Sequence, residues 1–158
     1  MNRWVRCAAV LLALGGGLPL HAAAEVSASD AWMRSTVPGQ KTTGVYLTLR
    51  TSAATSLVGV ASPIAVRGEV HEMRQDGGVM RMRSLPGLDL PAGRTVELKP
   101  GAVHLMLLDV QRPLRAGEAV PVVLTFRDAA GATSTMEVLA QVRGPAAHGG
   151  AVARAHSH

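Results

Sequence analysis

The chain has 158 residues, with 16 Lys and Arg against 11 Asp and Glu and a formal net charge of +5. Only 3% of its residues are aromatic while 47% are hydrophobic, so a folded core must rest on Val, Leu, Ala and Met. The positive charges are scattered arginines without a basic block, which argues against nucleic acid or a membrane surface as a partner.

Residues 1–24 have the pattern of a secretory signal peptide. Arg3 and Arg6 precede an apolar run over residues 7–20, and small residues end the segment at Ala24. The apolar run is too short for a comfortable membrane span, and no second stretch of about 20 apolar residues follows. The sequence therefore predicts an exported protein without an integral membrane segment.

Cleavage after Ala24 would leave residues 25–158, enough for one domain with a hydrophobic core. The charges that remain are 14 Lys and Arg against 11 Asp and Glu, a balance of +3. The only cysteine, Cys7, leaves with the signal, so no disulfide, thiolate ligand or cysteine nucleophile would remain. A lipid anchor needs a cysteine just after the apolar run, and Cys7 precedes it. We expect a monomer.

Short apolar or alternating runs predict eight strands along the chain. They cover residues 43–50, 57–61, 66–74, 79–83, 94–98, 103–110, 120–126 and 133–142. In the first run Val45, Leu47 and Leu49 share one face. Hairpin signals stand at residues 76–78 and 128–131. Because helical periodicity is weak and Gly and Pro separate the runs, we predict an all-β, antiparallel sandwich or barrel over residues 25–143.

The Asp-Gly-Gly hairpin admits two registers. A two-residue turn at Asp76-Gly77 places His71 opposite Met82, and it also places the oppositely charged Glu72 and Arg81 opposite each other. This charge match favours the turn at Asp76-Gly77. A turn at Gly77-Gly78 would place Met73 opposite Met82 instead.

Two histidines and two methionines stand out as a soft, uncharged ligand set: His71, Met82, His104 and Met106. Thioethers select monovalent copper over harder divalent ions, and imidazole tolerates it. Met73 and Met80 share the predicted hairpin face, where packing beside the site is the favoured role for them and an auxiliary Cu(I) ligand is the alternative. The sequence therefore predicts a Cu(I) site between the hairpin and the strand over residues 103–110.

Other chemistries fit this sequence less well. A blue-copper centre needs a cysteine thiolate, which the mature chain would lack. No Gly-x-Ser-x-Gly turn is present, so a hydrolase is not indicated and no enzymatic activity is expected. A plain structural sandwich, with His and Met as filler, is the remaining alternative.

The four candidate ligands resemble the motif of the PCuA(C) family of periplasmic copper chaperones. That motif is His, ten residues, Met, twenty-one residues, His, any residue and Met, and this chain meets it in full. The flanking segments Val70-His-Glu-Met73 and His104-Leu-Met-Leu107 are also similar to the family. The resemblance runs from about Trp32 to Val142.

The resemblance implies a cupredoxin-like Greek-key sandwich with an exposed Cu(I) site. It also implies a periplasmic protein that delivers copper to the CuA centre in subunit II of cytochrome c oxidase, directly or with a Sco-type thiol protein. Copper buffering or resistance, with the same site and no dedicated acceptor, is the alternative function.

Residues 144–158 form a separate segment rich in Ala, Gly and His, whose composition predicts a disordered tail. Imidazoles on a flexible chain bind Cu(II). The tail is therefore a second, Cu(II)-binding candidate, with the histidines His148, His156 and His158.

Overall fold

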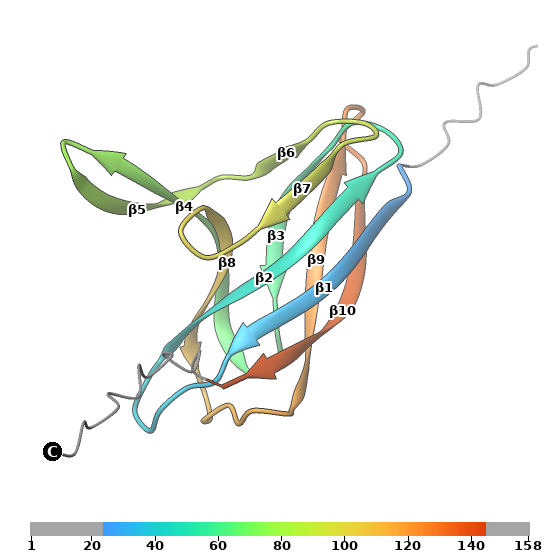
Figure 1. The fold of residues 1–158 in the computed structure, drawn as a ribbon. Coiled ribbons are helices and arrows are strands. Elements are labelled where there is room, and N and C mark those ends of the chain that lie inside the picture. The colour runs from blue at the N-terminus through green and yellow to red at the C-terminus, as the bar shows by residue number, and fades with distance from the viewer. Residues whose placement is uncertain (1–23, 145–158) are drawn as a thin grey trace, which may run out of the picture.

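The computed structural model describes residues 24–144, and in this range the chain is built from β-strands (Figure 1). The strands are β1 Val26–Arg34, β2 Thr42–Thr51, β3 Thr55–Ala61, β4 Ala65–Asp76, β5 Val79–Leu85, β6 Leu88–Leu90, β7 Thr95–Leu98, β8 Val103–Val110, β9 Ala119–Asp128 and β10 Thr133–Arg143. The predicted signal peptide, except for its last residue, and the tail from residue 145 lie outside the described residues. No helix in residues 24–144 is long and apolar enough to cross a membrane.

The strands form one curled sheet in the order β5-β4-β8-β2-β1-β10-β9-β3-β6, with β7 also paired to β2. The pairing of β1 with β10 is parallel, and the other described pairings are antiparallel. Several neighbours are far apart in sequence, such as β4 with β8 and β9 with β3, which is typical of Greek-key connections. The predicted all-β, cupredoxin-like class is confirmed, with the addition of one parallel pair.

The sheet curls so that β3 and β4 pack against each other. A Cβ on Gly68 would lie 2.7 Å from Cγ1 and 2.8 Å from the carbonyl carbon of Val60. Glycine is therefore required at this close approach of two strands. The enclosed core is aliphatic apart from Phe126, which is 2% exposed.

All eight predicted strands are present, and β2 buries Val45, Leu47 and Leu49 as the alternation predicted. Two strands were not predicted. β1 has the sequence VSASDAWMR and buries only Met33, so its apolar signal is weak. β6 has three residues, which is too short for a pattern.

The β4–β5 hairpin extends beyond the sandwich body (Figure 1). β5 is an edge strand, and every residue from Val79 to Ser84 is exposed. The candidate ligands on β5 therefore lie at the margin of the fold, whereas those on β8 lie beside the core.

Candidate metal centre

The two candidate histidines lie directly opposite each other on neighbouring strands. His71 of β4 pairs with His104 of β8, and their ring centroids are 6.1 Å apart. On β8, Leu105 is fully buried in the core. Because side chains alternate along a strand, His104 and Met106 share the opposite, outer face. The predicted sharing of one face by these two residues is confirmed.

The hairpin register differs from the one predicted. Met73, not His71, pairs with Met82, and His71 pairs with Ser84. The turn lies at Gly77-Gly78, with φ values of 58° and 83°. Both central residues of such a tight hairpin turn need positive φ, and two glycines adopt it without steric cost. The backbone requirement of the turn therefore sets the register.

The predicted charge pairing of Glu72 is satisfied by a different arginine. Glu72 forms an ion pair with Arg83 at 2.9 Å, in place of the predicted pair with Arg81. Arg81 lies 3.4 Å from Asp76 beside the turn. Since arginines occupy both positions, charge alone could not distinguish the two registers.

His71 is the centre of the candidate ligand set in this register. His104 lies directly across from it, Met106 is its diagonal neighbour on β8, and Met82 is its diagonal neighbour on β5. Diagonal neighbours lie about 7–8 Å apart, within reach of long side chains. Met73 is two residues from His71 on the same strand face and directly opposite Met82. Met80 lies farther out, opposite Gln75.

Each histidine keeps one ring nitrogen available. Nδ1–H of His104 donates to the carbonyl oxygen of Ala102 at 2.9 Å, which leaves the lone pair of Nε2 free. Nε2 of His71 lies 2.8 Å from Oε2 of Glu69 and donates to this carboxylate. Nδ1 of His71 is buried and has no hydrogen-bond partner among the described residues. An unpartnered buried nitrogen and soft neighbouring sulfurs fit a copper ion.

Glu69 was not singled out from the sequence, yet it orients His71. The hydrogen bond from His71 lowers the pKa of the Glu69 carboxyl, against the opposing effect of burial. Arg67 lies 3.6 Å away and supports the same charged form. Carboxylates that hold a ligating imidazole by its other nitrogen fix its orientation and raise its basicity. The signal available in the sequence was the spacing of two residues before His71, which places both side chains on one face.

The site runs from a buried to an exposed end. His104 is 4% exposed, while Met82 is 50% exposed on the projecting hairpin. Within residues 24–144, no group of three or more His, Cys, Asp and Glu side chains could hold a metal ion. The described part of the chain therefore offers a hard cation no carboxylate-rich site. The tail candidates His148, His156 and His158 lie outside the described residues.

The comparisons with known protein families and with known proteins agree with each other. A family model described as LpqE-like matches residues 26–138. The lipoprotein-like protein Lxx21020 of Leifsonia xyli subsp. xyli is 32% identical over 141 residues, which cover 83% of this chain and 84% of that protein.

Solved structures extend the likeness to the fold. The copper-bound PCuAC domain from PmoF2 has a TM-score of 0.62 at 23% identity, over 76% of this chain and 93% of that domain. Apo-DR1885 from Deinococcus radiodurans has a TM-score of 0.57 at 27% identity, over 92% of this chain and 95% of that one. The Cu(I) form of DR1885 has a TM-score of 0.52 at 28% identity, over 82% and 81%.

Removing the Glu69 carboxylate should weaken copper binding roughly 10- to 100-fold, the usual effect of losing a group that orients a metal ligand. Glu69→Ala leaves His71 without its partner, whereas Glu69→Gln retains a hydrogen-bond acceptor and should recover part of the affinity. The measurement is competition with a Cu(I) chelator. Glu97→Ala is the control, because within residues 24–144 this carboxylate pairs only with Lys99, at 3.3 Å. Equal affinities for Glu69→Ala and Glu97→Ala would contradict the prediction.

Proposed function

This chain belongs to the LpqE-like family, which is the PCuAC family, and from this premise we propose that it is an exported chaperone that binds and carries Cu(I). The observation that carries the proposal is the His71–His104 pair, with one free nitrogen on each ring. Met106 and Met82 flank this pair diagonally and supply two thioethers. The proposed ligands are thus two nitrogens and two sulfurs, without a formal charge.

The chemistry of this ligand set supports the monovalent state. Thioethers are soft donors that select Cu(I), and the absence of anionic ligands gives no advantage to Cu(II). The structural neighbour DR1885 is known in a Cu(I) form. In an oxidising compartment, methionines also bind copper without the tendency of paired cysteines to form disulfides.

The exposure of the site supports carriage in place of permanent storage. Met82 lies half-exposed on an edge strand, so an acceptor ligand can approach the metal there. A thiolate acceptor would bind soft copper more strongly than thioethers do. Copper would therefore move from this site to a thiolate site along a favourable gradient of affinity.

We propose the CuA centre in subunit II of cytochrome c oxidase as the destination, reached directly or through a Sco-type thiol protein. Both acceptors present the cysteine thiolates that this gradient requires. The family's lipoprotein-like relative supports a location outside the cytoplasm, and we propose the periplasm. A copper buffer would use the same site but would need no dedicated acceptor.

Met82→Leu and Met106→Leu should each abolish tight Cu(I) binding while the protein stays folded. These swaps nearly conserve volume and should cost less than about 1.5 kcal/mol of stability. Met80→Leu is a matched control, because Met80 is 51% exposed on the same hairpin face as Met82, which is 50% exposed. X-ray absorption of the Cu(I)-loaded protein should count two nitrogen and two sulfur neighbours. Retained affinity in both variants would mean that the site is misassigned.

Met73 is the remaining thioether on the hairpin face that carries Met82, and Met73→Leu tests whether it binds copper. It should leave Cu(I) affinity unchanged if Met73 is a packing residue beside the site. Loss of affinity in Met73→Leu together with retained affinity in Met82→Leu would assign the second sulfur to Met73, its cross-strand partner.

Deleting the gene should lower the CuA content of cytochrome c oxidase when copper is scarce, and added copper should restore it. Oxidase activity and the CuA spectrum are the measurements. Sensitivity to excess copper with a normal CuA content would instead support the buffering function. Complementation with the Met82→Leu protein separates loss of the copper site from loss of the protein.

Removing residues 145–158 should abolish a Cu(II) site on the tail while leaving Cu(I) binding intact. The reason is that His148, His156 and His158 are hard enough donors for Cu(II), whereas the Cu(I) ligands lie in the sandwich. Isothermal titration with each oxidation state is the measurement. Unchanged Cu(II) uptake by the shortened chain would exclude the tail.

A further inference from the structure

The outer face that carries His104 and Met106 continues onto β2. Met106 pairs with Gly44, and Tyr46 follows two residues along β2 on the same face. The ring of Tyr46 lies 6.1 Å from the ring of His104, centroid to centroid. Tyr46 is buried, at 7% exposed, although it does not belong to the main core cluster. An aromatic side chain therefore borders the candidate site on the side away from the hairpin.

The absence of a side chain at Gly44 leaves the space that the Tyr46 ring occupies. A Cβ on Gly44 would lie 2.8 Å from Cζ of Tyr46 and would also collide with its hydroxyl oxygen. The Tyr46 ring thus lies back along β2, over the backbone of Gly44. Because Gly44 is the cross-strand partner of Met106, the ring fills the space beside that methionine.

Trp32 supports Tyr46 from the next strand. β1 contains a bulge between Ser29, opposite Thr48, and Trp32, opposite Tyr46. Within it Asp30 has a φ of 53°. The extra residue brings Trp32 opposite Tyr46, with ring centroids 4.5 Å apart. Bulges often re-aim side chains next to functional sites.

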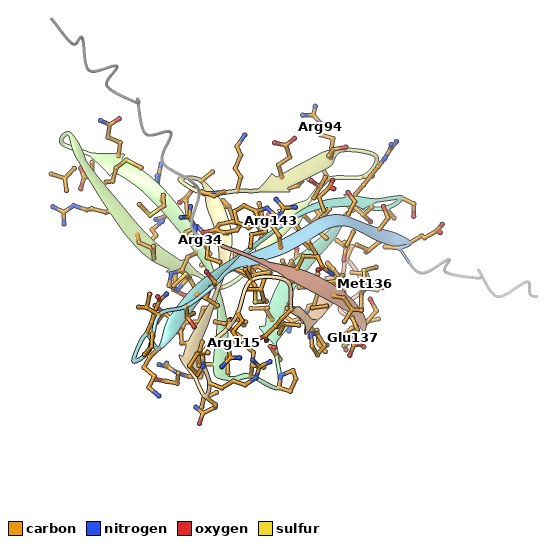
Figure 2. The ribbon with its side chains drawn as sticks, turned by 60° about the horizontal axis from the view of Figure 1, so that its bottom comes forward. Arg34, Arg94, Arg115, Met136, Glu137 and Arg143 are labelled. Atoms are coloured by element: carbon orange, nitrogen blue, oxygen red, sulfur yellow. The ribbon has the colours of Figure 1, made fainter. Side chains whose placement is uncertain are left out.

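Arg143 extends the arrangement at the end of β10. Its guanidinium carbon lies 4.8 Å from the centroid of the Trp32 ring, a cation–π contact. Figure 2 shows Arg143 beside Arg34, its register partner on β1. Trp32 therefore contacts both Tyr46 and a charged side chain, and these two contacts restrain the aromatic pair.

The site is consequently asymmetric. On the β2 side Tyr46 and His104 are 7% and 4% exposed, whereas on the hairpin side Met82 and Met80 are 50% and 51% exposed. A metal held by His71 and His104 would meet an aromatic wall in one direction and an open methionine face in the other.

We propose that Tyr46, supported by Trp32 and accommodated by Gly44, is a positioning residue that seals the β2 side of the copper site and slows oxidation of bound Cu(I). This inference rests on the proposed function. In the oxidation, Cu(I) gives one electron to dioxygen, which forms Cu(II) and superoxide. The apolar surroundings of a metal control solvent access and its redox potential. The seal restricts entry of water and dioxygen to the hairpin side, where an acceptor would also approach.

Tyr46→Val opens the sealed side while keeping a residue suited to a strand. The variant should bind one Cu(I) but oxidise it roughly 10-fold faster in air, as expected when the surroundings of a metal are lost. The rate is followed by the Cu(II) electron paramagnetic resonance signal. Tyr46→Phe is the matched control, because it keeps the ring and should oxidise at the rate of the unaltered protein.

Gly44→Ala tests the same seal with the tyrosine retained. Its Cβ displaces the Tyr46 ring, so Cu(I) oxidation should again accelerate. Added to Tyr46→Val, where the ring is absent, Gly44→Ala should cause no further acceleration, since the two changes act on one space. Near-ultraviolet circular dichroism of the metal-free variants reports the loss of the Trp32–Tyr46 pair, and thermal unfolding verifies the fold.

Two results separate this inference from the proposed function. If the unaltered protein binds no Cu(I), the proposed function is wrong. If Tyr46→Val and Gly44→Ala bind Cu(I) and both oxidise it at the unaltered rate, the function stands and the seal is wrong. Acceleration by Tyr46→Phe equal to that of Tyr46→Val would also overturn the seal, because the hydroxyl and not the ring would then be responsible.

Discussion

The antiparallel pairing of β4 with β8 is the constraint on which the rest of the site depends. It sets Val70 opposite Leu105 toward the core and His71 opposite His104 on the outer face. Val70 and Leu105 are 4% and 0% exposed, and full burial of such a side chain contributes about 1.5–3 kcal/mol. A slip of one residue would exchange the two faces and lose this burial. The hydrophobic core thus fixes the spacing of the two histidines, although neither one belongs to it.

The same sheet gives the two thioethers different surroundings. Met106 lies on β8, a strand whose neighbours Leu105 and Leu107 are fully buried, while Met82 lies on an edge strand beyond the core. Segments with few buried contacts open at a lower free-energy cost than core strands. A methionine on such a segment can move away from a bound metal without unfolding of the domain. In the proposed function, the histidine pair would be the fixed part of the site, and ligand exchange would occur at the hairpin.

Local alternation was enough to predict eight of the ten described strands and the face shared by His104 and Met106, because a period-two pattern is present wherever one face of a strand is buried. The hairpin register was predicted wrongly because Arg81 and Arg83 are equivalent partners for Glu72 by charge, while the backbone of Gly77-Gly78 decides the turn. β1 escaped prediction since it buries only Met33, and because its bulge at Asp30 also interrupts the alternation. The contacts of Tyr46 with Trp32 and His104 depend on which strands become neighbours, and the sequence alone did not supply that order.

Charge around the site follows from the same geometry. The proposed ligand set of imidazoles and thioethers would leave the single charge of Cu(I) uncompensated. Glu69 lies 2.8 Å from His71 and is held in its charged form by that hydrogen bond, which lowers its pKa. Its carboxylate would thus be separated from a metal bound at His71 by the imidazole ring and one hydrogen bond. An anion at that position favours a bound cation through the imidazole, yet it adds no hard oxygen ligand that would favour Cu(II). Arg67, at 3.6 Å from the same carboxylate, moderates this attraction, as the proposed release of the ion to an acceptor would require.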